Sequence, residues 1–159
     1  MRCRPLALVL FLVSALLAGA CGGKSPEEKA ADREEIQAFL EEYLPKMAQA
    51  YRTGDVEPIV PYSTEKERAA ILSRVRDLAR TGQVLAPELA SVEVEAVTVW
   101  SAVNAFVSTV EVWDVRVLAS GTEAVVREEP NQPNRVKYQL KREDGRWRVF
   151  GRQLEETYQ

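Results

Sequence analysis

Apolar side chains recur every three or four residues before Gly54, which predicts a long amphipathic helix. Ser25 is placed to cap the first turn, and Glu28 closes a capping box three residues later. Pro45 falls inside the pattern and is expected to kink the helix, because proline has no N–H to donate to the preceding turn. Gly54 is expected to end the helix. The predicted buried stripe consists of Ile36, Leu40, Tyr43 or Leu44, Met47 and Tyr51.

A second helix is predicted from Thr64 to Gly82. Thr64 is a residue type that caps helices, and Glu67 follows three positions later, which predicts another capping box. The apolar face of this helix is predicted to contain Ile71, Leu72, Val75, Leu78 and Ala79.

After Pro87 the apolar period shortens to two residues, which is typical of strands. The alternation changes phase near Ala96, and this change predicts a β-bulge. A long second strand is predicted over residues 105–118 and a weak third strand over residues 122–127. Residues 130–134 contain two prolines and two asparagines, which predicts a loop. Helices followed by antiparallel strands indicate an α+β domain.

The last hairpin is the clearest predicted element. Residues 144–145 are Asp-Gly, which favours a two-residue type I′ turn between alternating strands. This turn places Lys141 opposite Arg148. It also places Lys137 opposite Arg152 on the same face, so that these four bases form a basic stripe.

The basic stripe has two interpretations. Residues 135–152 carry seven bases and two acids, whereas residues 27–42 carry two bases and seven acids. In the first interpretation Glu93, Glu95 or Glu111 on neighbouring strands neutralises the stripe, as is usual for charged faces. In the second the stripe is a docking face for an acidic partner or for anionic lipid.

Composition narrows the possible functions. The 159 residues include 24 acids, 21 bases and no histidine, for a formal charge of −3. A chain of this length is expected to form one domain, and its charge disfavours nucleic-acid binding. The missing histidine excludes Ser-His-Asp and Cys-His relays and removes the commonest metal ligand. With no phosphate-binding motif either, we expect no cofactor and no metal.

The order of predicted elements resembles the NTF2-like superfamily. The resemblance rests on residues 51–55, which end a kinked first helix, and on the hairpin 138–149 with its tyrosine strand, Asp-Gly turn, tryptophan and valine. Residues 89–94 and 135–138 are more similar to the intermembrane-space (IMS) domain of the ARC6-type plastid-division proteins and their bacterial relatives. The resemblance implies an α+β cone over residues 26–157, in which a kinked N-terminal helix and a second helix pack on a curved antiparallel sheet around a pocket.

Some NTF2-like members are isomerases or cyclases of the SnoaL and ketosteroid-isomerase type, and others only bind partners. The catalytic members place an acid in the pocket, helped by a histidine or a tyrosine. Here the candidate acid is Glu111, with Trp113 beside it and Tyr43 or Tyr138 as hydrogen-bond donor. An acid buried among apolar side chains binds its proton more tightly, which suits a general base. The alternative is that a bulge turns Glu111 outward, where it pairs with a base of the last hairpin.

The N-terminus resembles a bacterial lipoprotein precursor. Residues 1–20 have a basic start and an apolar run over 6–17, which is typical of a signal peptide and too short to span a bilayer. Small residues at 18–20 then precede Cys21, and the resemblance implies that Cys21 is lipidated, with residues 21–25 as lipidated cysteine and flexible tether. The same small residues also fit an ordinary cleavage site. Removing residues 1–20 leaves 139 residues and a single cysteine, which excludes disulfides.

Together these features predict an exported, membrane-anchored envelope lipoprotein whose domain is a non-catalytic binding or adaptor module. Its expected partners are the membrane, through the lipid, and another envelope protein, but not nucleic acid. Gly22 is not the aspartate that retains lipoproteins at the inner membrane, which favours the outer membrane in a Gram-negative cell. The alternatives are an isomerase or cyclase that uses Glu111, and a carrier of an apolar ligand.

Overall fold

The computed structural model describes residues 25–157. The predicted signal peptide, Cys21 and most of the predicted tether therefore lie outside the described residues. The elements are α1 (Pro26–Thr53), the 3₁₀ helix η1 (Glu57–Tyr62), α2 (Glu65–Arg80), β1 (Gln83–Ser101), β2 (Asn104–Ala119), β3 (Val125–Glu143) and β4 (Arg146–Thr157).

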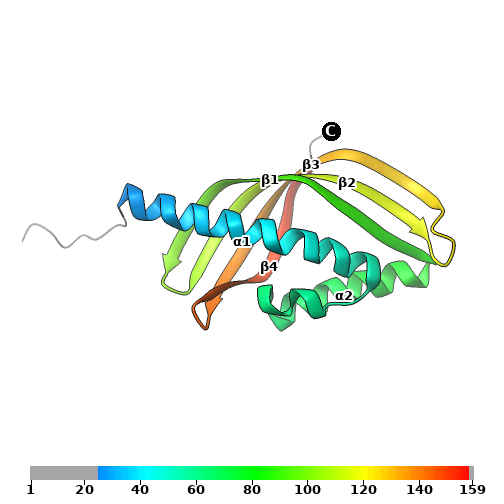
Figure 1. Ribbon diagram of the computed structural model, residues 1–159, viewed down its shortest axis with the longest axis horizontal. Helices are drawn as coiled ribbons and strands as arrows, with labels where there is room; N and C mark the ends of the chain where they lie inside the picture. The colour runs from blue at the N-terminus through cyan, green and yellow to red at the C-terminus, as the bar shows by residue number, and fades with distance from the viewer. Residues whose placement is uncertain (1–24, 158–159) are drawn as a thin grey trace, which may run out of the picture.

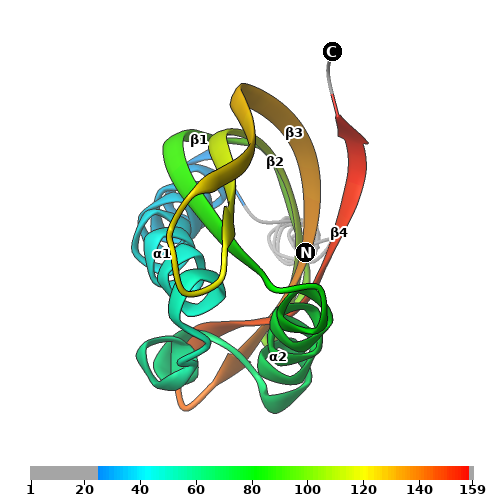
Figure 2. The same cartoon turned by 90° about the vertical axis from the view of Figure 1, so that its right-hand side faces the viewer.

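The four strands form one curved antiparallel sheet in the order β1-β2-β3-β4, and the helices cover its inner face (Figures 1 and 2). Between the layers lies a core in which Ile36, Leu40 and Leu44 of α1 meet Val107 of β2 and Leu140 of β3. The predicted α+β architecture, two helices on a curved antiparallel sheet, is confirmed. Across residues 25–157 no helix combines the length and the apolar character that spanning a bilayer requires.

Helix α1 begins and ends as its sequence predicts. The Ser25 side chain accepts a hydrogen bond from the Glu28 N–H at 3.2 Å, and the Glu28 carboxylate accepts one from the Ser25 N–H at 2.7 Å. Gly54 ends the helix in the left-handed conformation, at φ 75°. Pro45 lies inside the helix. Local side-chain chemistry therefore sets both ends of α1.

Helix α2 begins at the predicted place without the predicted capping box. The Thr64 hydroxyl donates to the Val149 carbonyl of β4 at 3.2 Å and makes no cap hydrogen bond. The Glu67 side chain is 3% exposed and points into the protein. The prediction was wrong because both partners of the expected box make tertiary hydrogen bonds, which local spacing does not reveal.

The sheet is longer and more irregular than predicted. The register shifts between Val94 and Ala96, which confirms the predicted bulge in β1. The predicted loop at residues 130–134 was wrong, because these residues are part of β3. The strand forms a bulge there. Asn131 has φ 51° in this bulge, and its N–H donates to the Asp114 carboxylate at 2.8 Å. Pairing with the long strand β2 keeps the segment extended despite its prolines.

A second unpredicted bulge lies in β4. Leu140 pairs with Val149, but Gln139, the residue before it in β3, pairs with Gly151. Phe150 is therefore an extra residue of β4. The bulge shifts residues 151–154 by one position, up to the next register shift at Glu155. It therefore decides which residues of β4 face outward.

The outer edge of β1 is covered by α1. The Gln37 amide donates to the Val92 carbonyl at 3.1 Å, and its oxygen accepts from the Val94 N–H at 3.0 Å. Arg33 donates to the Val94 carbonyl. These side chains satisfy backbone groups that an edge strand would otherwise offer to another chain.

Candidate functional site

Glu111 is a buried acid in the middle of β2. It is 2% exposed, and Ala105, Val107, Thr109 and Trp113 on the same face of the strand are also buried. The odd-numbered side chains of β2 therefore face the core. The alternative in which a bulge turns Glu111 outward to a base of the last hairpin is excluded.

Three neutral donors occupy the Glu111 carboxylate. One oxygen accepts from the Tyr138 hydroxyl at 2.5 Å and from the Thr109 hydroxyl at 3.0 Å. The other accepts from the Trp113 indole N–H at 2.8 Å. An indole N–H can only donate, so this carboxylate oxygen must act as the acceptor. Two of the three other predicted pocket residues, Trp113 and Tyr138, thus hydrogen-bond to Glu111.

Tyr43, the remaining predicted pocket residue, belongs to a second buried network. Its hydroxyl donates to the Glu67 carboxylate of α2 at 3.2 Å. The same oxygen of Glu67 accepts from the Arg152 guanidinium of β4 at 2.8 Å. Arg152 also donates to the Tyr51 hydroxyl. This network joins α1, α2 and β4 inside the domain.

Glu67 and Arg152 turn inward, although the sequence pattern did not predict an interior Glu67 and placed Arg152 on the outer face. Arg152 pairs with Tyr138 in the register, and Gln153 pairs with Lys137. The cause is the extra residue Phe150, which turns Arg152 from the outer face to the inner one. For Glu67 a signal was present, since it lies four residues before the buried Ile71 on one face of α2.

Burial governs the ionisation of these networks. It raises the pKa of the Tyr138 hydroxyl well above its usual range, and the negative Glu111 carboxylate adds to this shift. The pKa of Tyr43 is raised in the same way, by burial first and then by Glu67. Burial alone would lower the pKa of Arg152, but the surrounding tyrosine and glutamate oxygens raise it above its usual value. The tyrosines are therefore neutral donors, and Arg152 is a permanent cation.

The outer face of the sheet keeps a shorter basic stripe than predicted. Lys141 pairs with Arg148, as predicted from the turn, and Lys137 follows on the same face of β3. Part of the positive charge is neutralised by ion pairs. The Lys137 ammonium lies 3.6 Å from the Glu155 carboxylate, and the Arg148 guanidinium lies 3.5 Å from the Glu143 carboxylate.

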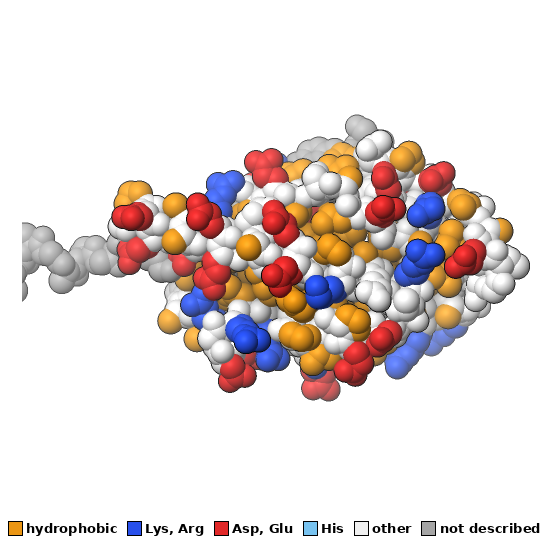
Figure 3. Space-filling model, in the orientation of Figure 1, with side chains coloured by type: hydrophobic (Ala, Val, Ile, Leu, Met, Phe, Trp, Pro, Cys, Tyr) orange, Lys and Arg blue, Asp and Glu red, His pale blue; other side chains and the backbone are white. Residues whose placement is uncertain are grey.

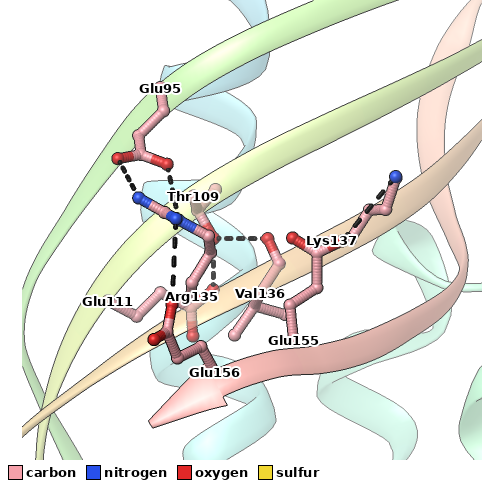
Figure 4. A network of polar contacts seen from close by, with 8 residues as sticks. All are labelled: Glu95, Thr109, Glu111, Arg135, Val136, Lys137, Glu155 and Glu156. Atoms are coloured by element: carbon pink, nitrogen blue, oxygen red, sulfur yellow. Dashed lines mark hydrogen bonds and ion pairs between the residues drawn. The ribbon is translucent and has the colours of Figure 1, made fainter. Parts of the chain in front are cut away.

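Glutamates also neutralise the neighbouring base. Arg135 bonds both carboxylate oxygens of Glu95, at 3.0 and 3.1 Å, and approaches Glu156 at 3.9 Å (Figure 4). Figure 4 also shows Thr109 and Glu111 beneath this ion pair, on the inner side of the sheet. Of the three glutamates considered for neutralising the stripe, Glu95 thus pairs with a hairpin base and Glu111 does not.

A groove opens between the outer face of the sheet and α2. Its volume is about 310 Å³, and its lining includes Phe106, Lys137, Phe150 and Gly151. The ammonium groups of Lys66 and Lys141 lie 4.2 and 4.1 Å from the centre of the Phe150 ring. Within residues 25–157 neither lysine forms an ion pair with a carboxylate. The groove therefore combines an aromatic wall with two lysines that form no ion pair within the described residues, and the paired residues Glu67 and Arg152 also line it.

Negative charge gathers along α1. Acidic side chains follow the exposed side of α1 (Figure 3).

In the part of the chain that the structure describes, no group of three or more acidic, histidine or cysteine side chains is placed to hold a metal ion.

Comparison with known proteins identifies the fold. No protein-family model and no curated protein matches this chain. Among solved structures, the intermembrane-space region of the chloroplast protein ARC6 matches with a TM-score of 0.63 and 15% identity, over 77% of this chain and 95% of that one. An NTF2-like protein with a cystatin-like fold from Novosphingobium aromaticivorans matches with a TM-score of 0.46 and 20% identity, over 84% of this chain and 90% of that one. The chain therefore shares the fold of the ARC6 intermembrane-space region.

Another neighbour carries a different description. A ketosteroid isomerase-like protein from Erwinia carotovora atroseptica matches with a TM-score of 0.47 and 14% identity, over 74% of this chain and 93% of that one. At such identities the likeness extends to the fold alone, and NTF2-like folds host unrelated functions. Function must therefore be argued from the residues.

Proposed function

We propose that this chain is a lipid-anchored lipoprotein of a bacterial envelope, and that its NTF2-like domain is a non-catalytic binding module. The observation that carries the proposal is the state of Glu111. Its carboxylate is 2% exposed, and three side chains of its own domain occupy both of its oxygens. Glu111 is the acid that the sequence pattern singled out as a general base for the alternative, an isomerase or cyclase.

A general base must come within hydrogen-bond reach of the proton that it removes. Glu111 would have to release Tyr138, Thr109 or Trp113 before it could reach a substrate. The Thr109 hydroxyl could turn to the Val136 carbonyl at 3.3 Å, but a released Tyr138 or Trp113 would be buried without its acceptor. Such a release costs about 1–3 kcal/mol for each group. The contacts therefore favour a structural role for the acid, and the binding function is assigned to the outer surface.

The binding surface is the outer face of β3 and β4 with its groove. Lys137, Lys141 and Arg148 line one side of the sheet, and the ammonium groups of Lys66 and Lys141 both contact the Phe150 ring. Opposite charge across an interface speeds association and selects the partner. The partner that fits is an acidic segment of another envelope protein.

The test of the docking face is crosslinking of the acylated protein in its native envelope. In one variant Lys137, Lys141 and Arg148 are replaced by glutamine. Arg152 is kept, because its ion pair with Glu67 is internal. We expect recovery of the crosslinked partner to fall by about tenfold or more, which corresponds to a loss of ~1.4 kcal/mol.

The matched control replaces three exposed bases of α2, Arg74, Arg76 and Arg80, with glutamine. It removes the same charge from another surface and should leave the partner bound. Recovery of the same partners at the same level from both variants would show that the basic face does not dock them.

The anchor has a separate test. Labelled palmitate should enter the wild-type protein and be absent from Cys21→Ser. Incorporation that persists in the serine variant would contradict the lipoprotein assignment. Fractionation of the two membranes in a Gram-negative host should place the acylated protein in the outer membrane, since Gly22 follows the cysteine.

A further inference from the structure

The tip of the β1–β2 hairpin has an unusual composition. Residues 96–110 contain no charged side chain, although 28% of the chain is charged. They form the end of β1, the turn and the beginning of β2. This hairpin tip, residues 96–110, therefore has no ion pair with which to specify a polar partner.

The hairpin tip exposes large apolar side chains. Trp100 is 57% exposed, Val103 is 51% exposed and Phe106 is 38% exposed. The Trp100 and Phe106 rings stack with their centres 6.1 Å apart. A contiguous exposed apolar patch of this kind marks an interaction site more often than a scattered surface residue does.

The hairpin tip lies at the end of the molecule where α1 begins (Figure 1). Arg142 links the two, because its N–H donates to the Val103 carbonyl at 2.8 Å and its side chain bonds Glu35 of α1 at 2.6 Å. Only five positions separate Pro26 from Cys21 in the sequence, and an extended chain of that length spans at most about 18 Å. A lipid on Cys21 would therefore keep the start of α1 close to a bilayer.

Lysines border the apolar patch. The Lys137 ammonium lies 6.0 Å from the centre of the Phe106 ring, and Lys141 pairs with Asn104 at the start of β2. Tryptophan prefers the headgroup region of a bilayer, and lysine near the surface is attracted to anionic lipid. Aromatic side chains at a tip with lysines behind them fit a membrane surface. They fit a protein partner less well, because a specific protein interface also uses polar groups, and the tip offers no charged ones.

We infer that the β1–β2 hairpin tip is a second membrane contact, in which Trp100 and Val103 enter the headgroup region of an anionic bilayer. Phe106, at the edge of the groove, supports the Trp100 ring by stacking on it. The inference rests on the proposed anchoring near a membrane. With two contacts the domain has a defined orientation on the bilayer, instead of turning freely on its tether.

Trp100 reports directly on this contact. The chain has three tryptophans, and Trp113 and Trp147 are only 5% and 4% exposed. The acylated protein is reconstituted into phosphatidylethanolamine–phosphatidylglycerol vesicles, in which brominated acyl chains quench tryptophan fluorescence. We expect bromine near the headgroups to quench the exposed component strongly, and we expect Trp100→Phe to lose that component. Quenching that is unchanged by Trp100→Phe, or absent, would overturn the inference.

The unacylated variant Cys21→Ser separates the hairpin tip from the anchor. It should bind vesicles rich in phosphatidylglycerol weakly, and Val103→Asp in the same background should reduce this binding about tenfold or more. Val126→Asp is the matched control, because Val126 is 55% exposed and lies in β3 outside the hairpin tip. It should leave vesicle binding unchanged.

The outcomes distinguish the two proposals. Trp100 quenching in an unacylated protein would support the hairpin tip even if Cys21 proved not to carry lipid. Palmitate on Cys21 without Trp100 quenching would retain the anchor and overturn the hairpin tip. If Trp100 is shielded in intact envelopes but is not quenched in vesicles, the tip binds protein and the inference is wrong.

Discussion

At the scale of single residues, Glu111 shows how an acid can be buried without a cation beside it. Three donors from three side chains satisfy its oxygens, and two of them, Thr109 and Trp113, lie two positions away on the same face of β2. Alternation along the strand brings these residues to one side. The third donor, Tyr138, comes from β3, so the network also ties neighbouring strands together.

Replacement of Glu111 by glutamine tests this structural role. A glutamine amide has a donor where the carboxylate has an acceptor, and so at least one of Tyr138, Thr109 and Trp113 loses its partner. We expect the free energy of unfolding to fall by about 1–3 kcal/mol, measured by urea denaturation.

The matched control is Glu95→Gln on the neighbouring strand β1. Glu95 pairs with Arg135 at the surface, with about a third of each side chain exposed, and the loss should stay below ~1 kcal/mol. Equal losses in the two variants would mean that the buried network contributes no more than a surface ion pair.

At the scale of elements, the ion pair between Glu67 and Arg152 joins α2 to β4. α2 has few buried residues of its own, since only Glu67 and Ile71 are buried in it. The network with Tyr43 and Tyr51 therefore contributes much of what holds this helix against the sheet. A bulge in one strand, by turning Arg152 inward, thus determines how a distant helix docks.

Arg152→Met should destabilise the domain strongly. It leaves the Glu67 carboxylate, which is 3% exposed, without its cation, and breaking a buried pair from one side costs about 3–5 kcal/mol. The double variant Glu67→Gln with Arg152→Met should recover part of this loss, because no unpaired charge remains. Urea denaturation measures both.

Arg116→Met serves as the control, since Arg116 faces Glu88 at 3.7 Å with both side chains largely exposed. It should change stability by less than ~1 kcal/mol. If the double variant is less stable than Arg152→Met alone, an unpaired Glu67 charge is not the source of the cost.

At the scale of the whole molecule, the two buried tyrosines make folding sensitive to alkaline pH. The pKa of Tyr43 and that of Tyr138 are raised by burial, so the folded protein holds both phenol protons more tightly than the unfolded chain. An unfolded tyrosine loses its proton near pH ~10. Stability should therefore be independent of these groups below that pH and should fall as the pH rises above it.

The prediction is tested with Tyr138→Phe. Each tyrosine that stays protonated in the folded state steepens the loss of stability by up to about 1.4 kcal/mol per pH unit. The phenylalanine variant starts from lower stability because Glu111 loses a donor, but its decline above pH ~10 should be shallower than that of the wild type. Urea denaturation at a series of pH values gives both slopes, and parallel curves would contradict the assignment of the effect to Tyr138.

How much of this could be predicted from the sequence depends on the range of the interactions. The ends of α1 and the Asp-Gly turn were predicted correctly, because caps and tight turns depend on residues a few positions apart. Which face of β2 points inward was left open, because alternation along a strand does not say which of its two faces is buried. The capping box at Thr64 and the loop at residues 130–134 were predicted wrongly. In each case a distant strand, β4 or β2, offered partners that outweighed the local preference.

The sequence by itself determined the α+β class and the candidate anchor Cys21, since periodicity and short motifs encode them directly. Only the tertiary structure decided that Glu111 faces the core, that donors enclose it and that Arg152 turns to the inner face of the sheet. It also brought Trp100 and Phe106 together at one end of the molecule. The physical reason is that one extra residue in a strand, such as Phe150, exchanges the two faces of the residues that follow it, up to the next register shift. Which residue becomes the extra one depends on the strands and helices packed around it.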